Sequence, residues 1–469
     1  MQRALLYLLV AASYLLLAGG PAWALGCLLP VAAAGALMDA PRTWQRLSRP
    51  EWLERGWLLL LLASVLQLLP LPVAALDQLS PHARDLRQAL VLTSGVDAWV
   101  PISIAPWATA RAVGSLALGL LAYLGARALL DVHGGVRALC RALAWGGAVA
   151  ALVAAVQRAA APTLLMGLVT PEAPNARPFG PFVNRNHFAA WLLLASAVAA
   201  GYFVAHLRLR LARHGPLADQ IRRVLGTRAA GLFAAISAMA AVLLLTLSRS
   251  GAVGLGAATM SFWWVARRRV DWPRTGWALT GIAGAALLMG AAVVDLDAWA
   301  ARLDHTFTAG PRPDGRLVIW RESWPIVRDF WLTGAGAGTY GTAMLTYQQS
   351  RIWVPHLAAW AHFNQAHNHP LQVLAEGGLL LALPAAMAGA GLIAAGRRAL
   401  AGDRTEIFWI RAGAAAGLAG VAVQSLWEIP LTMPANAVLA AVLAAILLHH
   451  PRAEPRQRPR GDQDASDDA

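Results

Sequence analysis

The chain has 469 residues, of which 58% are hydrophobic and 14% charged, and its formal net charge is +14. This composition excludes an ordinary soluble fold, because a globule of this size cannot bury so much apolar surface. Repeated apolar runs, close to the roughly 20 residues that a helix needs to cross a bilayer, predict an all-α polytopic membrane protein. The basic residues are all arginine and are expected to set membrane topology, so no nucleic-acid partner is predicted.

The two cysteines, Cys27 and Cys140, lie within or beside apolar runs. The chain has no CxxC pattern and no Cys/His cluster. These features argue against a disulfide framework, redox chemistry and a thiolate metal site. We therefore expect neither a metal nor another cofactor.

The apolar runs predict about twelve transmembrane helices. The first run also resembles a signal peptide, with a cleavage pattern at Ala22-Trp23-Ala24, but cleavage there would leave a short second run. We therefore expect both runs to be membrane helices. In chain order the runs are residues 4–17, 25–38, 57–76, 108–130, 142–156, 188–206, 229–247, 252–265, 277–294, 371–395, 410–426 and 436–448.

Most of the arginines collect in alternate connections between these runs, which predicts that both termini are cytoplasmic. We expect residues 1–450 to form a single integral membrane domain. Residues 295–370 are then a periplasmic insertion, and a connection of this length is expected to contain helices and part of the function. Residues 451–469 have no apolar period and are predicted to be a disordered cytoplasmic tail.

Polar residues enter one span directly from the exported side, at Asn184-Arg185-Asn186-His187. One interpretation is a polar cap on the start of the helix. The other is a cluster of donors that faces a phosphate or a sugar at the membrane surface. The sequence leaves both interpretations open.

Arg249 lies in a tight reversal between two apolar runs, in Ser248-Arg249-Ser250-Gly251. A charge at this depth is costly unless it faces a cavity or a partner, so Arg249 is a candidate functional residue. A side chain that merely reaches the membrane interface is the alternative.

Arg316, Trp320 and Trp324 follow one another at the spacing of one helical face. An arginine fork suits phosphate, and tryptophan rings stack on sugars, so this face is expected to bind substrate. An interfacial helix with no ligand is the alternative. The glycines that follow, at residues 334–338, lack the ending of a nucleotide P-loop and predict a tight turn.

Two histidines precede the next apolar run, in His367-Asn368-His369-Pro370. Proline suits the first turn of a helix, which places His367 and Asn368 just outside it. An imidazole in that position can take a proton from an attacking hydroxyl.

Gln372 and Glu376 lie one turn apart and share a face that points back toward these histidines. We expect Glu376 to orient one of them. A zinc site built from His362, His367 and His369 is the alternative, but its spacing matches no standard pattern.

At these residues the chain resembles the O-antigen ligase and polymerase superfamily of membrane glycosyltransferases. The resemblance covers roughly residues 181–380, and the first 175 residues match only in hydropathy. It rests on an ordered set of short motifs: Phe182-Val183-Asn184-Arg185-Asn186-His187-Phe188, Ser248-Arg249-Ser250-Gly251, Gly315-Arg316-Leu317-Val318-Ile319-Trp320, Gly334-Ala335-Gly336-Ala337-Gly338, His367-Asn368, Leu371-Gln372 and Glu376-Gly377.

The resemblance implies a helical fold of the lipid-linked-sugar glycosyltransferase type, with metal-independent chemistry on the periplasmic face of the bacterial inner membrane. The donor is expected to be a glycan on undecaprenyl pyrophosphate. The acceptor is lipid A-core in a ligase of lipopolysaccharide biosynthesis, which we favour, and another lipid-linked glycan in an O-antigen or exopolysaccharide polymerase. A lipid-linked-sugar transporter or flippase is a further alternative, but the polar groups gather at one face rather than in the middle of spans.

The resemblance also implies roles for individual residues. His367 is expected to be the base that activates the acceptor hydroxyl, while Arg249 and Arg316 hold the pyrophosphate leaving group. Because His369-Pro370 departs from the bulky apolar pair of the family, which of the two histidines is the base stays open. The residues expected to bind substrate are Asn184, Arg185, Asn186, His187, Trp320, Asn368, His369, Gln372 and Glu376.

Overall fold

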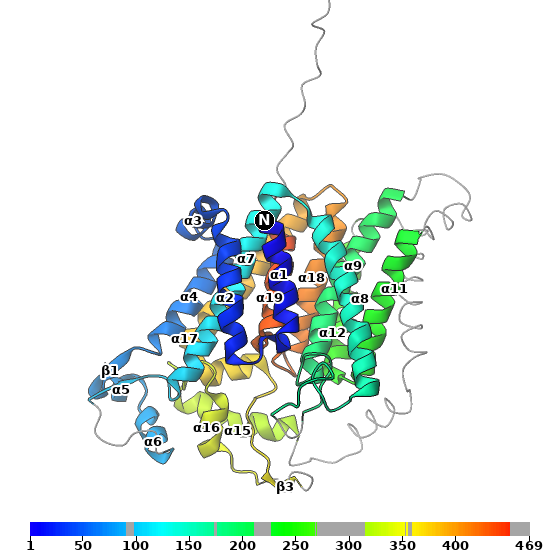
Figure 1. The fold of residues 1–469 in the computed structure, drawn as a ribbon. Coiled ribbons are helices and arrows are strands. Elements are labelled where there is room, and N and C mark those ends of the chain that lie inside the picture. Colours follow the sequence, from blue (N-terminus) through cyan, green and yellow to red (C-terminus); the bar gives the residue numbers. More distant parts are fainter. Residues whose placement is uncertain are drawn as a thin grey trace, which may run out of the picture.

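The computed structural model describes residues 1–90, 98–172, 176–210, 227–267, 269, 315–351, 353–354 and 359–450. These residues form a bundle of helices with a smaller layer at one end (Figure 1). The described chain is mostly helical, which confirms the predicted helical class. The predicted span at 277–294, residues 295–314 of the predicted insertion and the predicted tail at 451–469 lie outside the described residues.

Helices occupy most of the predicted apolar runs. The bundle consists of α1 Gln2–Leu15, α2 Ala22–Leu37, α4 Trp52–Leu66, α7 Pro106–His133, α8 Val136–Ala160, α9 Arg185–Arg210, α11 Thr227–Leu245, α12 Arg249–Ala266, α17 His369–Gly402, α18 Ile407–Gln424 and α19 Pro434–Leu448. Short helices join some of them: η1 Leu17–Gly19, α3 Ala40–Ser48 and η3 Pro430–Thr432.

Six of these helices are long and apolar enough to cross a membrane, namely α7, α8, α9, α11, α17 and α18. The bent pair α2 and α3 raises the number to 7 if it counts as one span. α1 and α19 are apolar but shorter. Within the described residues, the predicted count of about twelve spans is therefore not confirmed.

The predicted run at residues 57–76 does not form one continuous helix. α4 ends at Leu66, because Pro70 and Pro72 lack the backbone N–H that would continue the helix. The chain continues in the smaller layer as β1 Pro70–Pro72, α5 Val73–Leu79, α6 His82–Ala89 and β2 Trp99–Pro101, with β1 antiparallel to β2.

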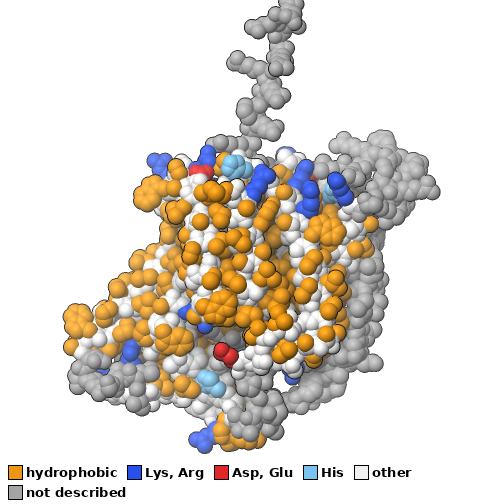
Figure 2. Space-filling view, viewed as in Figure 1, with side chains coloured by type: hydrophobic (Ala, Val, Ile, Leu, Met, Phe, Trp, Pro, Cys, Tyr) orange, Lys and Arg blue, Asp and Glu red, His pale blue; other side chains and the backbone are white. Residues whose placement is uncertain are grey.

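The two ends of the bundle differ in charge. Arginine side chains gather along the end where α1 begins, at the top of Figure 2, and we name this the arginine-rich end. Arg46 in α3 pairs there with Asp131 of α7, whose other carboxylate oxygen accepts the backbone N–H of His450 after α19. The start of the chain and the end of its last helix therefore lie at the same end of the bundle.

The main hydrophobic core surrounds α9, the most enclosed of the six long helices. Gly201 of α9 and Gly413 of α18 let the two backbones approach closely. A Cβ at Gly201 would lie 2.4 Å from the carbonyl oxygen of Trp409, and one at Gly413 would lie 2.5 Å from that of Ala197. Small residues at such crossings allow tight packing between membrane helices.

A second hydrophobic core lies at the opposite end of the bundle (Figure 1). It contains side chains of α15 Arg316–Asp329 and α16 Tyr340–Tyr347. The chain between α16 and α17 also forms a hairpin of β3 Trp353–Val354 and β4 Ala359–Trp360. The buried side chains of this core come from two distant stretches, including Leu76, Leu86, Ile104, Ile326, Phe330 and Met344. The layer is therefore built on residues 70–104 as well as on the predicted insertion.

The predicted glycine turn is confirmed and joins this layer to the bundle. Gly334, Gly336 and Gly338 all have positive φ, a conformation that glycine adopts without strain. Gln67 at the end of α4 fixes the turn, since its Oε1 accepts the N–H of Ala337 at 2.9 Å.

Candidate active site

A buried carboxylate, Glu428, lies at the centre of the candidate site. Its side chain is 0% exposed, in the connection between α18 and η3. Four side chains surround it: Nδ1 of His367 at 2.8 Å, Nδ2 of Asn186 at 2.5 Å, Nη2 of Arg316 at 3.4 Å and Nε2 of His187 at 3.8 Å. A buried carboxylate needs such partners, because an isolated charge is costly to keep away from water.

The charge of Glu428 follows from these neighbours. Burial by itself raises the pKa of the carboxyl, but the imidazoles of His187 and His367 outweigh burial and hold that pKa well below its usual range. Glu428 is therefore ionised at neutral pH. Of the two imidazoles, that of His367 lies within hydrogen-bond distance, whereas His187 lies at an ion-pair distance.

The start of α9 contributes two of these groups. Asn184 caps the helix, because its Oδ1 accepts the N–H of Asn186 at 2.9 Å. This contact supports the cap interpretation for Asn184, while Asn186 and His187 reach inward to Glu428. Arg185, the first residue of α9, is half-buried.

The backbone at His367 has a conformation that its neighbours must hold. Its φ is +49°, in the left-handed region that residues other than glycine rarely adopt. The carbonyl of Ala366 accepts the indole N–H of Trp320 at 3.0 Å, and the N–H of Ala366 donates to Oε1 of Gln372, also at 3.0 Å. Trp320 and Gln372 therefore fix the segment that presents His367.

α17 begins where the proline predicts. Asn368 is its N-cap, because its side-chain oxygen accepts the N–H of Leu371 at 2.9 Å, and Pro370 lies in the first turn. His367 accordingly stands just before the helix, as expected. His369 is the first helical residue; its N–H donates to the carbonyl of Ser425 at 2.8 Å, and its Nδ1 is buried with no hydrogen-bond partner in the described part of the chain.

The expectation that Glu376 orients a histidine is wrong. Its Oε2 accepts the N–H of Gly338 at 2.8 Å, and its Oε1 accepts the N–H of Tyr340 at 3.3 Å and the amide of Gln372 at 2.9 Å. Glu376 therefore holds the end of the glycine turn rather than an imidazole, and Gln372 links it to the segment before His367. The carboxylate beside His367 is Glu428.

Arg316 and Arg249 approach the site from two helix starts. Arg316 is the first residue of α15 and Arg249 the first of α12, directly after the short reversal that the sequence predicts. Burial lowers the pKa of Arg316, the carboxylate of Glu428 opposes this shift, and the charge of Arg249 adds to it. The two guanidinium groups are thus close enough to repel each other, an arrangement that favours an anionic ligand between them.

Sequence reasoning missed Glu428, although a signal was present. It is the single acidic residue in the connection between the last two apolar runs. The alternation of arginines assigns that connection to the same side as residues 295–370. A lone carboxylate beside apolar spans is costly and therefore a candidate functional residue.

The geometry fits acid–base chemistry at His367. When a carboxylate accepts the Nδ1–H of a neutral imidazole, the lone pair of Nε2 is left to take a proton. The His367 side chain is 28% exposed, so the ring is reachable from the surface. Across the described ranges, no group of three or more His, Cys, Asp or Glu side chains is placed to hold a metal ion, and so His362, His367 and His369 form no such group.

Part of the sequence matches a known protein family. Residues 234–386 match the model of the family described as O-antigen ligase. The match runs from α11 into α17 and includes Arg249, Arg316 and His367, whereas Glu428 and the start of α9 lie outside it. No curated protein matches the chain.

Proposed function

Because the chain contains an O-antigen ligase domain and belongs to the O-antigen ligase superfamily, we propose that it transfers a glycan from a polyprenyl pyrophosphate to an acceptor hydroxyl. The apolar helices and this family indicate a multi-pass bacterial membrane protein of the glycosyltransferase type. The observation that carries the proposal is the contact of 2.8 Å between His367 and the buried Glu428, beside Arg316.

In the proposed reaction, His367 is the general base. Its Nε2 takes the proton of the acceptor hydroxyl as the acceptor oxygen attacks the anomeric carbon of the donor glycan. Glu428 holds the ring through Nδ1 and stabilises the imidazolium that forms. Contacts that fix His367, from Trp320 and Gln372, serve to position the ring rather than to touch substrate.

The leaving group is the polyprenyl pyrophosphate, which departs with the electron pair of the broken glycosidic bond. Arg316 and Arg249 hold its phosphates, and Arg185 at the start of α9 is a further contact. A pyrophosphate already leaves readily, so positioning and charge stabilisation supply most of the catalysis. Asn186, His187, Asn368 and His369 line the same region and are proposed to contact substrate.

We place this chemistry on the periplasmic face of the inner membrane, with undecaprenyl pyrophosphate as the donor lipid. Lipid A-core is the proposed acceptor, and a second lipid-linked glycan, as in a polymerase, is the alternative. Both acceptors present a sugar hydroxyl to the same base.

The test uses the purified full-length protein with a labelled glycan on undecaprenyl pyrophosphate. Lipid A-core is offered in one reaction and omitted in the other. A single capped product with lipid A-core supports ligation, and a ladder of lengthening lipid-linked glycans in its absence supports polymerisation. Neither product, with no release of undecaprenyl pyrophosphate from a folded protein, would overturn the proposed function.

A further inference from the structure

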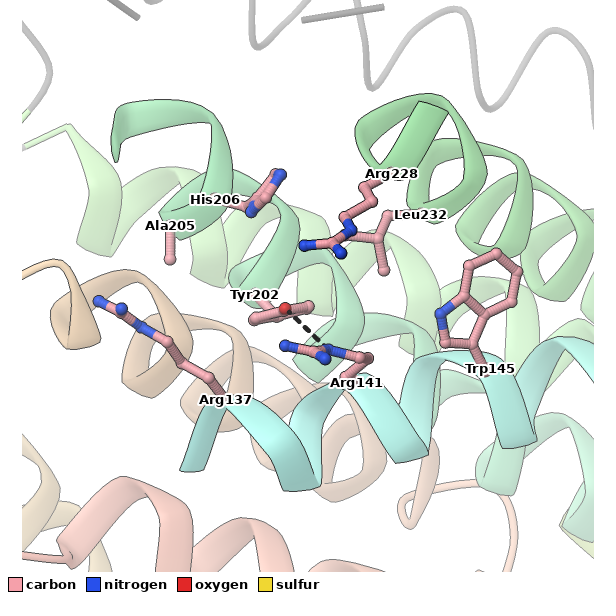
Figure 3. Close-up of a pocket in the computed structure, with 8 residues that line it drawn as sticks. All are labelled: Arg137, Arg141, Trp145, Tyr202, Ala205, His206, Arg228 and Leu232. Atoms are coloured by element: carbon pink, nitrogen blue, oxygen red, sulfur yellow. Dashed lines mark hydrogen bonds between the residues drawn. The ribbon is translucent and has the colours of Figure 1, made fainter. Parts of the chain in front are cut away.

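A pocket of about 330 Å³ lies at the arginine-rich end, and Figure 3 shows the residues that line it. The candidate active site lies at the opposite end of the bundle, where α9 and α17 begin (Figure 1). In the described part of the chain, the lining of the pocket comes from the start of α8, the end of α9 and the start of α11. Its lining residues are Arg137, Arg141, Trp145, Tyr202, Ala205, His206, Arg228 and Leu232. Nothing in the proposed glycan transfer uses this pocket.

Arginine dominates the charge of the described lining. Three of the described residues that line the pocket are arginines, and none of them is a carboxylate. Arg141 and Arg228 point toward the middle of the pocket, where the hydroxyl of Tyr202 lies, and Arg137 lies at the edge (Figure 3). Arg141 contacts that hydroxyl through Nε at 3.4 Å, so its terminal fork nitrogens are not used in this contact. Converging guanidinium groups repel one another unless an anion lies between them.

The pocket also changes character with depth. Along α8, Arg137, Arg141 and Trp145 follow at intervals of one helical turn, so that cations lie at the helix end and an aromatic ring lies deeper. Arg228 and Leu232 repeat this order on α11. A ligand that matches the pocket therefore has an anionic head and an apolar body.

The outer wall of the pocket faces the surroundings of the bundle. Trp145 is 47% exposed, and its ring lies against α11, where a Cβ at Gly231 would be 2.9 Å from its Cη2. Tryptophan in such a position is typical of the interface between headgroups and acyl chains. A basic pocket between membrane helices, open to the lipid, is a known form of headgroup site.

Because the lining changes from arginine to apolar side chains with depth, we propose that the pocket binds the phosphate headgroup of an anionic glycerophospholipid from the adjoining leaflet. Arg141 and Arg228 hold the phosphate, Arg137 attracts it, and Trp145 and Leu232 contact the start of the acyl chains. A soluble phosphate ester shares the head chemistry but lacks the apolar body, which separates the two sources of ligand.

The test measures lipid binding by native mass spectrometry of the purified full-length protein. Phosphatidylglycerol and phosphatidylcholine are titrated separately, and glycerol 3-phosphate is then added as a soluble competitor. We expect phosphatidylglycerol to bind at least about tenfold more tightly than phosphatidylcholine. Both lipids carry a phosphate, but the quaternary ammonium of choline is repelled by the arginines of the pocket. Glycerol 3-phosphate at the same concentration should not displace it.

Two variants test whether the preference for phosphatidylglycerol arises in this pocket. Arg141→Gln combined with Arg228→Gln should abolish the preference for phosphatidylglycerol, and Gly231→Leu, which keeps every charge but displaces Trp145, should weaken binding. Arg397→Gln removes an exposed arginine at the same end outside the pocket and should change nothing. An unchanged preference in the double variant would overturn the proposal. Equal competition by glycerol 3-phosphate would overturn the assignment to a lipid.

Discussion

Nδ1 of His367 lies 2.8 Å from Oε1 of Glu428, although 61 positions separate the two residues in the chain. The carboxylate is fully buried and the imidazole is partly exposed. This pairing fixes the direction of the ring and favours the tautomer that carries its proton on Nδ1. It gives the site a base whose other nitrogen faces outward from the carboxylate.

Replacing Glu428 by Gln tests the pairing directly. The amide keeps the shape but removes the charge that stabilises the imidazolium, so kcat should fall by about 10² to 10⁴-fold. The rate is measured as transfer from a lipid-linked glycan at neutral pH.

Glu51→Gln is the matched control, since it removes an exposed carboxylate at the arginine-rich end. It should leave the rate unchanged. A folded Glu428→Gln protein that transfers glycan at the wild-type rate would show that Glu428 has only a structural role.

The two arginines of the site should act on the leaving group. Arg316→Ala and Arg249→Ala should each lower kcat/KM by about tenfold to a hundredfold, the range expected when one charge-assisted contact is lost. Added undecaprenyl pyrophosphate should also inhibit these variants less strongly than the wild type. A general loss of folding would lower the rate without weakening inhibition of the molecules that stay folded. Arg316→Lys should fall between wild type and Ala, because lysine keeps the charge without the planar fork.

Arg321→Ala serves as the control on the same helix, where its side chain is exposed. If Arg316→Ala leaves product inhibition at the wild-type value, Arg316 does not hold the pyrophosphate.

The sequence allowed local features of the site to be predicted better than contacts across the fold. Pro370 and Asn368 indicate where α17 begins, and the reversal before Arg249 follows from two apolar runs that nearly meet. Glu428 could not be paired with His367, because the contact depends on how the end of α18 meets the start of α17, where the N–H of His369 donates to the carbonyl of Ser425. Spacing shows that Gln372 and Glu376 share a face, but not what that face meets.

The membrane helices illustrate the same limit. Hydropathy alone extends one span through residues 57–76, whereas Pro70 and Pro72 stop α4 at Leu66. The chain segment that follows then joins the second hydrophobic core, which no local pattern indicates. Backbone chemistry overrides hydropathy where the two disagree.

The glycine turn should be intolerant of a side chain at Gly334. Its φ is +69°, and a Cβ there would lie 2.1 Å from the carbonyl oxygen of Glu376. Gly334→Ala is therefore expected to cost about 1–3 kcal/mol or more and to lower the Tm of the purified protein. Gly389→Ala, at a helical glycine whose Cβ would meet nothing within 4 Å, should leave the Tm nearly unchanged. Equal Tm values for the two variants would contradict the close approach.

Acid should weaken the arginine-rich end through His449. Burial lowers the pKa of its imidazole to about 4, against an ordinary value near 6.5, and its Nδ1 lies 2.6 Å from the carbonyl oxygen of Ile446. The unfolded chain therefore binds a proton that the folded chain excludes, so stability is full above about pH 6.5 and falls as the pH drops toward 4. The loss amounts to up to about 3 kcal/mol.

His449→Gln cannot take up that proton, so its Tm should depend less on pH between 7 and 4 than that of the wild type. Thermal unfolding in buffers of equal ionic strength measures the difference. Parallel curves for the two proteins would show that His449 does not titrate on unfolding.

The most direct test of the proposed mechanism is the single-turnover release of undecaprenyl pyrophosphate from a saturating lipid-linked glycan donor with acceptor present. His367→Ala should slow this release by at least about a hundredfold, because it removes the base. His369→Gln should slow it far less, and His362→Gln, at an exposed histidine, should match the wild type. A folded His367→Ala protein that releases undecaprenyl pyrophosphate at the wild-type rate would contradict the assignment of His367 as the base.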